Sequence, residues 1–261
     1  MKKRALRKDF YMEIRKSLGR FLSIFFIVAM GVAFFSGIRA SEPDLRYSGD
    51  AYFDRNHLMD LKVMGTLGLT ENDVQAIRSL EGVAQAEPGY SADVMVERDG
   101  NQKVLHVSSI LDSMNQYTVE EGRMPKKDGE CLIDQDFIQG SDLKVGDEIT
   151  LISGTKDPVT DTFTKETFRI VGAGSSPEYI SFHRGSSMIG NGEVSGFLAV
   201  QKESFVTEAY TECYVSVEGA EEETAFTEEY DQKVEKVAER IESIGERQGA
   251  LHAEEIRGDA K

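Results

Sequence analysis

The sequence predicts an α+β protein in which one N-terminal transmembrane helix precedes a two-lobed extracytoplasmic domain and a C-terminal coiled-coil-like helix. Three observations predict this class: an uncharged apolar segment at residues 21–38, short β-like runs spread over residues 61–217, and a heptad-like pattern after residue 221. The 261 residues suffice for one large domain or two modest ones. With 40% hydrophobic and 29% charged residues, the composition argues against wholesale disorder.

The formal charge of −16 is distributed unevenly along the chain. Residues 1–20 carry +6, residues 21–38 carry no charge, and the remaining 223 residues carry −22. The acidic total argues against nucleic acid as a partner, because phosphate binding needs a basic surface. Apolar residues four apart in the basic segment predict an amphipathic helix at the lipid headgroups, with a disordered basic tail as the alternative. These residues are Leu6, Phe10, Ile14 and Leu18.

Residues 21–38 are predicted to cross the membrane. As a helix, this segment rises about 27 Å, which is close to the thickness of a hydrocarbon core. The preceding basic residues place the N-terminus in the cytoplasm and the acidic body outside. A cleavable signal peptide is the alternative, but the apolar run is too long for one and Ile38-Arg39-Ala40 is a poor cleavage site. The predicted membrane anchor comprises Arg20, Phe21, Phe25, Phe26, Gly31, Phe34, Phe35 and Arg39.

The first half of the body is predicted to open with a strand at Leu61–Met64. Thr70 suits the N-cap of a following helix, with Asp73 at the N3 position of a capping box. Gly82 is placed to end this helix. The buried face of the helix is formed by Val74, Ile77 and Leu80. A hairpin with Asp99-Gly100-Asn101 at its turn is predicted from two β-like runs, Val94–Glu97 and Lys103–Ser108.

The chain from residue 121 onward is predicted to be rich in short strands. Gly172–Gly192 contains five glycines and is predicted to be a long exposed loop, the most suitable place for a binding contact. Short apolar runs predict a small sheet or barrel-like unit. These runs are Cys131–Ile133, Leu143–Ile152, Thr167–Gly172, Gly196–Val200 and Cys213–Val217.

Residues 221–261 are predicted to begin a coiled-coil arm. The apolar residues follow spacings of 4, 3, 4, 3 and 7, with Gln248 in the intervening position: Tyr230, Val234, Val237, Ile241, Ile244 and Leu251. The 3.5-residue period favours a coiled coil or a helical hairpin, and an amphipathic helix packed on the domain is the alternative. Because a long amphipathic helix needs a covering partner, we expect the sequence to be the N-terminal part of a longer protein.

A search for catalytic chemistry leads us to expect no enzymatic activity, no metal and no cofactor in this chain. The sequence contains no P-loop, no G-x-S-x-G and no H-E-x-x-H, and its four histidines are far apart. Asp134 and Asp136 resemble a solvated strand edge, and a calcium site there would need more oxygen ligands. Cys131 and Cys213 are interpreted as two buried small residues, or as a disulfide if their strands are adjacent.

Four segments, in order along the chain, resemble a known family. Ser17–Ser23 enters an apolar helix, and Glu121–Pro125 is followed by Gly129-Glu130 in an E-G-R-x-P…G-E pattern. Leu143–Asp147 and Phe168–Gly172 follow. Together they resemble the first transmembrane segment and the MacB-like periplasmic core domain of FtsX/MacB-type ABC transporter permeases. The motif residues, expected to be structural, are Glu121, Gly122, Arg123, Pro125, Gly129, Glu130, Gly146, Asp147 and Gly172.

The resemblance implies a division of labour between subunits. It places the core domain at residues 39–220, with a porter-like lobe at about 50–120 and a β-rich lobe at about 121–200. A separate cytoplasmic ATPase subunit would bind ATP, and the permease would form a dimer in the bacterial inner membrane. Its outer domain would move during export or mechanotransmission, in contact with an extracytoplasmic protein or a lipid or peptide substrate. The alternative is a single-pass scaffold or regulator that recruits a cell-wall enzyme through its outer domain and arm.

Overall fold

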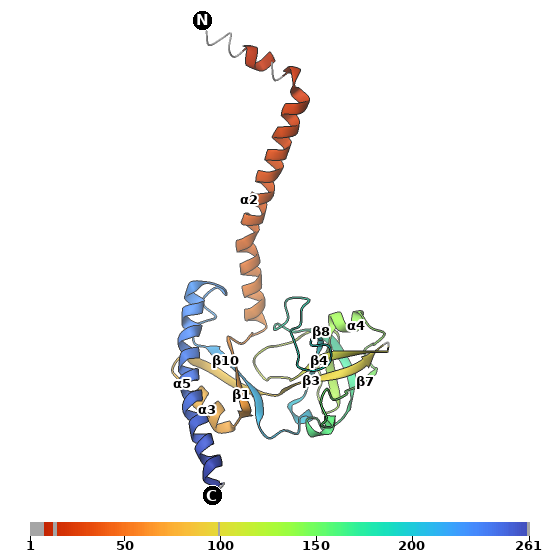
Figure 1. Ribbon diagram of the computed structural model, residues 1–261, viewed down its shortest axis with the longest axis vertical. Coiled ribbons are helices and arrows are strands. Elements are labelled where there is room, and N and C mark those ends of the chain that lie inside the picture. Colours follow the sequence, from red (N-terminus) through yellow and green to blue (C-terminus); the bar gives the residue numbers. More distant parts are fainter. Residues whose placement is uncertain (1–7, 13–14, 99, 260–261) are drawn as a thin grey trace. The chain divides into compact units, whose positions relative to one another are not determined.

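The computed structural model describes residues 8–12, 15–98 and 100–259, and it describes side chains up to residue 245 except that of Arg98. The chain divides into two compact units, Met1–Gly49 and Asp50–Lys261, which are treated separately. Figure 1 shows a long N-terminal helix, a body with two sheets and a C-terminal helix. The predicted α+β class is therefore confirmed.

The N-terminal helix α2 spans Leu18–Arg55 and is longer than the predicted segment 21–38. Within the described part of the chain, it is the one helix that is long and apolar enough to cross a membrane. Its large apolar side chains between Leu18 and Ile38 are all exposed, as lipid-facing side chains would be. Residues 8–12 are also helical, whereas Leu6 and Ile14 of the predicted amphipathic helix lie outside the described residues.

Helix α2 continues beyond the apolar segment into a polar stretch that ends at Arg55. Pro43 lies inside the helix and has no amide hydrogen to donate. The Ser41 hydroxyl donates to the carbonyl oxygen of Gly37 at 3.1 Å, and Arg46 pairs with Glu42 at 3.2 Å, one helical turn away. The helix thus contains the polar residues after Arg39 as well as the predicted apolar segment.

The smaller sheet of the body has three antiparallel strands in the order β1-β10-β2. The strands are β1 (Leu61–Leu69), β2 (Val83–Gly89) and β10 (Tyr210–Val217). Strand β2 was not predicted from the sequence. It contains Pro88, which has no amide hydrogen to donate, and the strand tolerates it because β2 lies at the edge of the sheet.

Helix α3 (Glu71–Arg78) covers the small sheet. Its start is confirmed, because Thr70 caps the helix and forms the predicted capping box with Asp73. Its end differs from the prediction, because the helix is capped at Ser79. Gly82 instead has a φ of +92° and forms the turn into β2.

The larger sheet has seven strands in the order β3-β4-β9-β6-β8-β5, with β7 paired to β8. Its strands are β3 (Ser91–Arg98), β4 (Asn101–Ser109), β5 (Thr118–Gly122), β6 (Glu130–Asp134), β7 (Glu148–Thr150), β8 (Thr167–Ser175) and β9 (Val194–Val200). A backbone bridge between Met95 and Ile152 ties β3 to the chain after β7, so the sheet curls into a half-barrel. Short helices α4 (Gln135–Gln139), η1 (Val159–Asp161) and η2 (Lys202–Ser204) connect the strands.

The distribution of strands between the sheets differs from their order along the chain. The predicted hairpin is confirmed as β3 and β4, which are joined across residues 99–100. This hairpin belongs to the larger sheet, whereas β10, from the second half of the chain, is the central strand of the smaller one. Gly172 and Gly174 lie inside β8, so the long loop begins after Ser175. The division into lobes at residue 120 therefore does not coincide with the division into sheets.

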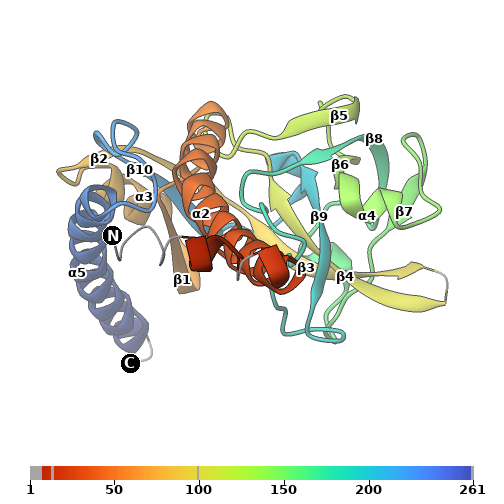
Figure 2. The same cartoon turned by 90° about the horizontal axis from the view of Figure 1, so that it is seen from above.

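The C-terminal helix α5 spans Glu228–Asp259 and begins by packing on the small sheet. Val237 and Ile241 are buried in the same core as Val74 and Val215, with Tyr230 and Val234 packed at its margin. Figure 2 shows α5 beside α3 and the small sheet. The first part of the apolar stripe is thus used inside the domain, as in the alternative interpretation. The side chains of Gln248 and Leu251 lie outside the described residues, so a coiled coil there stays a prediction.

We expect Ile241→Ala to lower the free energy of unfolding of the body by about 2–4 kcal/mol, because the substitution leaves a cavity in the core under α5. Glu242→Ala, on the exposed face of the same turn, should change it by less than about 0.5 kcal/mol. Denaturant unfolding of the detergent-solubilised chain can be followed by tyrosine fluorescence, since the chain contains no Trp. Equal effects of the two substitutions would mean that α5 is a free arm.

Candidate functional site

The motif residues are brought together where β5, β6, β7 and β8 meet. Arg123 forms a two-pronged ion pair with Glu130, with both N–O distances at 2.7 Å, and the amide of Lys126 donates to the same carboxylate at 3.0 Å. The Arg123 guanidinium and this amide lower the pKa of Glu130 to about 2. The E-G-R-x-P…G-E pattern thus closes the turn between β5 and β6.

The glycines of the motif allow close approach of two backbones at this corner. Gly122 has a φ of +76°, and a Cβ there would meet the carbonyl oxygen of Val171. A Cβ on Gly172 would meet the backbone of Arg123. The amide of Gly146 donates to Ile170 at 2.8 Å. Three further hydrogen bonds complete the corner. The Gln201 side chain donates to the Pro125 carbonyl. The backbone amide of Arg169 donates to the Gly129 carbonyl, and that of Lys144 donates to the Asp147 carboxylate.

Glu121 pairs with Ala173 between β5 and β8, and its side chain is exposed. The predicted anchor residues Arg20, Phe21, Phe25, Phe26, Gly31, Phe34, Phe35 and Arg39 all lie along α2. They and the motif residues are therefore two separate sets, one on the helix and one in the large sheet.

A polar joint attaches the end of α2 to the body. Beyond Arg55, the backbone carbonyls of Asn56 and His57 accept hydrogen bonds from the amides of Gln116 and Asn115, both at 2.8 Å. The Asn115 side-chain oxygen in turn accepts from the amide of Met59 at 2.9 Å. Asn56 and Asn115 are buried, so these hydrogen bonds satisfy polar groups that have little access to water. The segment between α2 and β1 is thereby held by the loop between β4 and β5.

The backbone at the joint adopts conformations that are uncommon for ordinary residues. His57 has a φ of +47° and Asn115 a φ of +48°. Asparagine tolerates this left-handed region better than most residues, because its short side chain bonds locally. The side chain of Thr118, the first residue of β5, also donates to Asn56 at 3.2 Å. The joint therefore contacts a strand of the large sheet directly and lies just before the first strand of the small sheet in the chain.

A second set of charges links the two sheets beside the joint. Lys62 of β1 lies 2.9 Å from Glu178 in the loop after β8 and 3.5 Å from Glu212 of β10. Burial acts to lower the pKa of Lys62, but the two carboxylates outweigh it and hold that pKa above its usual value. Asn115 donates to Glu178 at 3.3 Å, and the Tyr214 hydroxyl donates to Glu212. The cluster thus couples β1, β10, the joint and the long loop.

The long loop between β8 and β9 is held by a buried arginine. Arg184 donates to Asp134 at 2.7 and 3.1 Å and to Asp136 at 2.6 Å. The interpretation of this pair as a solvated edge is therefore wrong for Asp134, which is 1% exposed, whereas Asp136 is exposed. The counter-charge is a guanidinium from the loop, which offsets one of the two negative charges of the pair.

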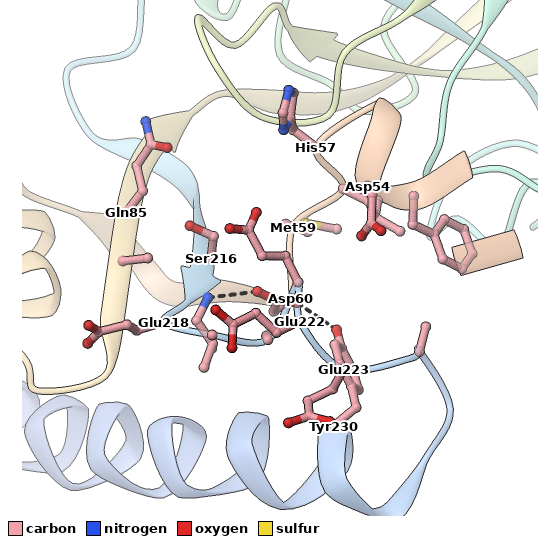
Figure 3. A pocket seen from close by; sticks show the side chains of 18 of the residues that line it. Asp54, His57, Met59, Asp60, Gln85, Ser216, Glu218, Glu222, Glu223 and Tyr230 are labelled. Carbon is pink, nitrogen blue, oxygen red and sulfur yellow. Dashed lines mark hydrogen bonds between the residues drawn. The ribbon is translucent and has the colours of Figure 1, made fainter. Parts of the chain in front are cut away.

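An acidic hollow of about 490 Å³ lies between the joint and the start of α5. Asp60 sits at its wall and accepts from the Tyr230 hydroxyl at 2.6 Å and from the amide of Val217 at 2.7 Å (Figure 3). Burial and the neighbouring Asp50 raise the pKa of Asp54. The hollow is lined by seven carboxylates, from Asp50, Asp54, Asp60, Glu218, Glu221, Glu222 and Glu223. It attracts cations generally.

The described residues contain no group of three His, Cys, Asp or Glu side chains placed to hold a metal ion. His106 lies 2.7 Å from Asp93 and is held between strands. Cys131 and Cys213 are unpaired and buried in the separate cores of the two sheets, as the first interpretation of them expected. Burial raises the pKa of the Cys213 thiol to about 11, which makes it unreactive at neutral pH.

Sequence reasoning missed the residues of the joint and of the two charge clusters. Asn56, Lys62, Asn115, Glu178 and Arg184 carry no periodic signal, because their partners are distant in sequence. One usable signal was the Asn56-His57 pair directly after the helix, because histidine is among the residues that tolerate the left-handed backbone that His57 adopts.

These features define a class of protein, a two-sheet α+β domain built on the end of a long apolar helix. The chain belongs to the family of the MacB-like periplasmic core domain, whose family model matches residues 18–242. The resemblance inferred from the motifs is thereby confirmed. No curated protein matches the chain significantly.

Three solved structures are similar to the chain at a low level. The extracellular domain of the noncanonic ABC-type transporter YknZ from Gram-positive bacteria is 13% identical, with a TM-score of 0.38 and coverage of 59% of this chain and 75% of that one. The periplasmic region of MacB from Actinobacillus actinomycetemcomitans is 10% identical, with a TM-score of 0.39 and coverage of 70% and 76%. A domain of a putative permease protein from Porphyromonas gingivalis is 14% identical, with a TM-score of 0.30 and coverage of 69% and 71%.

The Arg123–Glu130 pair should make stability depend on acid. Because the pKa of Glu130 is lowered to about 2, its contribution is present above its ordinary pKa of 4.5 and is lost as the pH falls through about 2. Arg123→Ala should therefore be less stable than the parent at pH 7, and this difference should shrink between pH 4.5 and pH 2. Lys127→Ala, whose ammonium is exposed and 4.0 Å from Glu130, is the matched control. A difference that is constant with pH would contradict the assignment.

The joint should depend on the side chain of Asn115. Asn115→Ala leaves the half-buried amide of Met59 without its acceptor, so we expect a loss of about 1–3 kcal/mol in the free energy of unfolding. Asn115→Gly should be less harmful than Ala, because glycine accepts the positive φ without strain. Gln102→Ala, at an exposed position, is the control. Unchanged hydrogen exchange at residues 56–60 in Asn115→Ala would show that the joint is not held by this contact.

Proposed function

We propose that this chain is the N-terminal part of a permease subunit of an FtsX/MacB-type ABC transporter. Residues 21–38 would cross the bacterial inner membrane with the N-terminus in the cytoplasm, and the body would lie outside. Membership of the MacB-like periplasmic core domain family supports this assignment. The length and composition of α2 and the positive charge of residues 1–20 support the orientation.

In this proposal the chain is not an enzyme and binds no cofactor. ATP would be bound and hydrolysed by a separate cytoplasmic ATPase subunit, and two permease subunits would form a dimer. The body would contact an extracytoplasmic protein or a lipid or peptide substrate, and its movement would serve export or mechanotransmission. The motif corner around Arg123 would serve as structure and not as a binding site, because its polar groups are already paired with one another.

The observation on which the proposal chiefly rests is the joint. A helix that moved in the membrane could displace the body only if the connection between them were stiff. Asn56 and His57 are each bonded to the loop between β4 and β5, and Lys62 ties the next strand to β10 and to the long loop. A movement of the last turn of α2 would therefore reach both sheets through short, buried contacts.

The test is whether ATP moves the body through the joint. The full permease and its ATPase are reconstituted in sealed vesicles with a spin label at Lys156→Cys in an exposed loop. We expect ATP to change the distance between the labels of the two permease copies. A Gly-Gly-Ser-Gly insertion after Arg55 should abolish this change while ATP hydrolysis continues, because it adds a flexible linker before the joint.

The matched control is the same insertion after Gly100, at the tip of the β3–β4 hairpin, where a side chain would meet no other atom. It should leave the ATP-dependent change intact. Persistence of the change with the insertion after Arg55 would contradict transmission through the joint. A parent complex in which ATP never changes the distance would instead favour the single-pass scaffold.

A further inference from the structure

The long loop between β8 and β9 places bulky apolar side chains in solvent. Phe182 is 94% exposed, Met188 is 101% exposed and Ile180 is 68% exposed. Outside α2, few side chains of the described body combine this size, apolar character and exposure. Three of them lie within nine residues of one loop, and we call residues 179–191 the loop tip. An exposed apolar cluster of this kind marks a contact surface.

The loop tip is held in a defined shape. Arg184, whose side chain is 8% exposed, bonds to Asp134 and Asp136 and also donates to the carbonyl of Ser181. The ring of Tyr179 stacks on Phe197 with 5.5 Å between centroids. The Ser187 hydroxyl donates to Asp93 at 2.5 Å, and the amide of Val194 donates to Gly185 at 3.1 Å. The apolar side chains are thus presented by an ordered loop, which lowers the entropy cost of binding.

The loop tip also presents no free formal charge when His183 is neutral. Arg184 is its one ionised residue by sequence, and that charge is compensated by two aspartates. Just before the tip, Glu178 is paired with Lys62. This differs from the chain after residue 38 as a whole, which carries −22. A surface that is apolar and uncharged can enter the lipid headgroup region at little electrostatic cost, whereas the acidic remainder cannot.

The root of the loop lies beside the end of α2. Asn115 donates its side-chain amide to Glu178 at 3.3 Å and its backbone amide to the carbonyl of His57 at 2.8 Å. If residues 21–38 cross the membrane, the helical segment from Arg39 to Arg55 limits the joint to about 26 Å from the apolar segment. The helix therefore acts as a covalent tether that keeps the loop root close to the lipid surface, which raises the effective concentration of lipid at the loop.

We propose that the loop tip docks on the lipid bilayer, with Phe182 and Met188 inserted at the boundary between headgroups and acyl chains. This inference rests on the proposed membrane position of α2 and adds a second membrane contact to it. The body would then be held at the membrane by two points, helix α2 and the loop tip. Glu178, at the root of the loop, would connect both points to β1 through Lys62 and to the joint through Asn115. Bilayer contact would set the angle of the body, so a movement of α2 would rotate the body instead of only translating it.

The test uses the full chain in phosphatidylcholine nanodiscs with single spin labels. Cys131 and Cys213 are each 0% exposed, so introduced cysteines are labelled selectively. Power saturation with oxygen and with a water-soluble nickel chelate reports the depth of each label. We expect labels at Phe182→Cys and Met188→Cys to be reached by oxygen and shielded from nickel. A label at Lys156→Cys should be reached by nickel, and one at Phe34→Cys should report the hydrocarbon core.

The outcomes separate this inference from the proposed function. Nickel access at Phe182→Cys and Met188→Cys, together with a lipid signal at Phe34→Cys, would overturn the docking of the loop and leave the membrane helix in place. Nickel access at Phe34→Cys as well would overturn both. Labels in the loop tip that are shielded from oxygen and nickel alike, in nanodiscs and in detergent, would indicate a protein contact and would also overturn lipid docking.

Discussion

The fold depends on the double pairing of strand β10. This strand hydrogen-bonds β1 on one side and β2 on the other, although more than 110 residues separate it from either neighbour. The small sheet therefore cannot be completed until the chain has built the large sheet and returned. Helix α5 follows directly and covers the core that β10 completes, through Val237 and Ile241. The pairing of β10 with β1 also brings Glu212 to Lys62, which in turn pairs with Glu178. Loop closure over such a distance is costly in entropy, and it is offset only by contacts that form together.

Polar groups connect the two sheets alongside a small apolar cluster of Leu111, Met114 and Tyr214. The large and small sheets have separate apolar cores, and Lys62, Glu178, Glu212 and Asn115 lie between them. Buried charges of this kind contribute little net stability, since desolvation opposes their attraction. They are directional, however, so they define how one sheet is placed against the other. An apolar interface would permit sliding at little cost. A connection that transmits displacement needs the directional kind, and this is the arrangement at the end of α2.

The elements that were predicted correctly have signals within a few residues of one another. The capping box of Thr70 and Asp73, the β3–β4 hairpin and the apolar strands around Cys131 and Phe168 are examples. The predictions that differed depend on partners far away. Strand β2, for which no prediction was made, pairs only with the distant β10, and the buried Asp134 has its partner Arg184 fifty residues later. The heptad pattern of α5 identified its apolar stripe but not its partner, because a sheet and a second helix can cover the same residues.

The amino-acid sequence by itself determined that an apolar helix precedes an acidic α+β body, and its motifs were sufficient to indicate the family. Those properties are local or additive: hydropathy over a run of residues, charge summed over a segment, glycines where φ must be positive. Only the tertiary structure decided which strands share a sheet, where the charges pair and how the helix is attached. Asn56 and Asn115 show the reason. Nothing in the sequence distinguishes them from other polar residues, but the fold buries both, so their polar groups form hydrogen bonds within the protein.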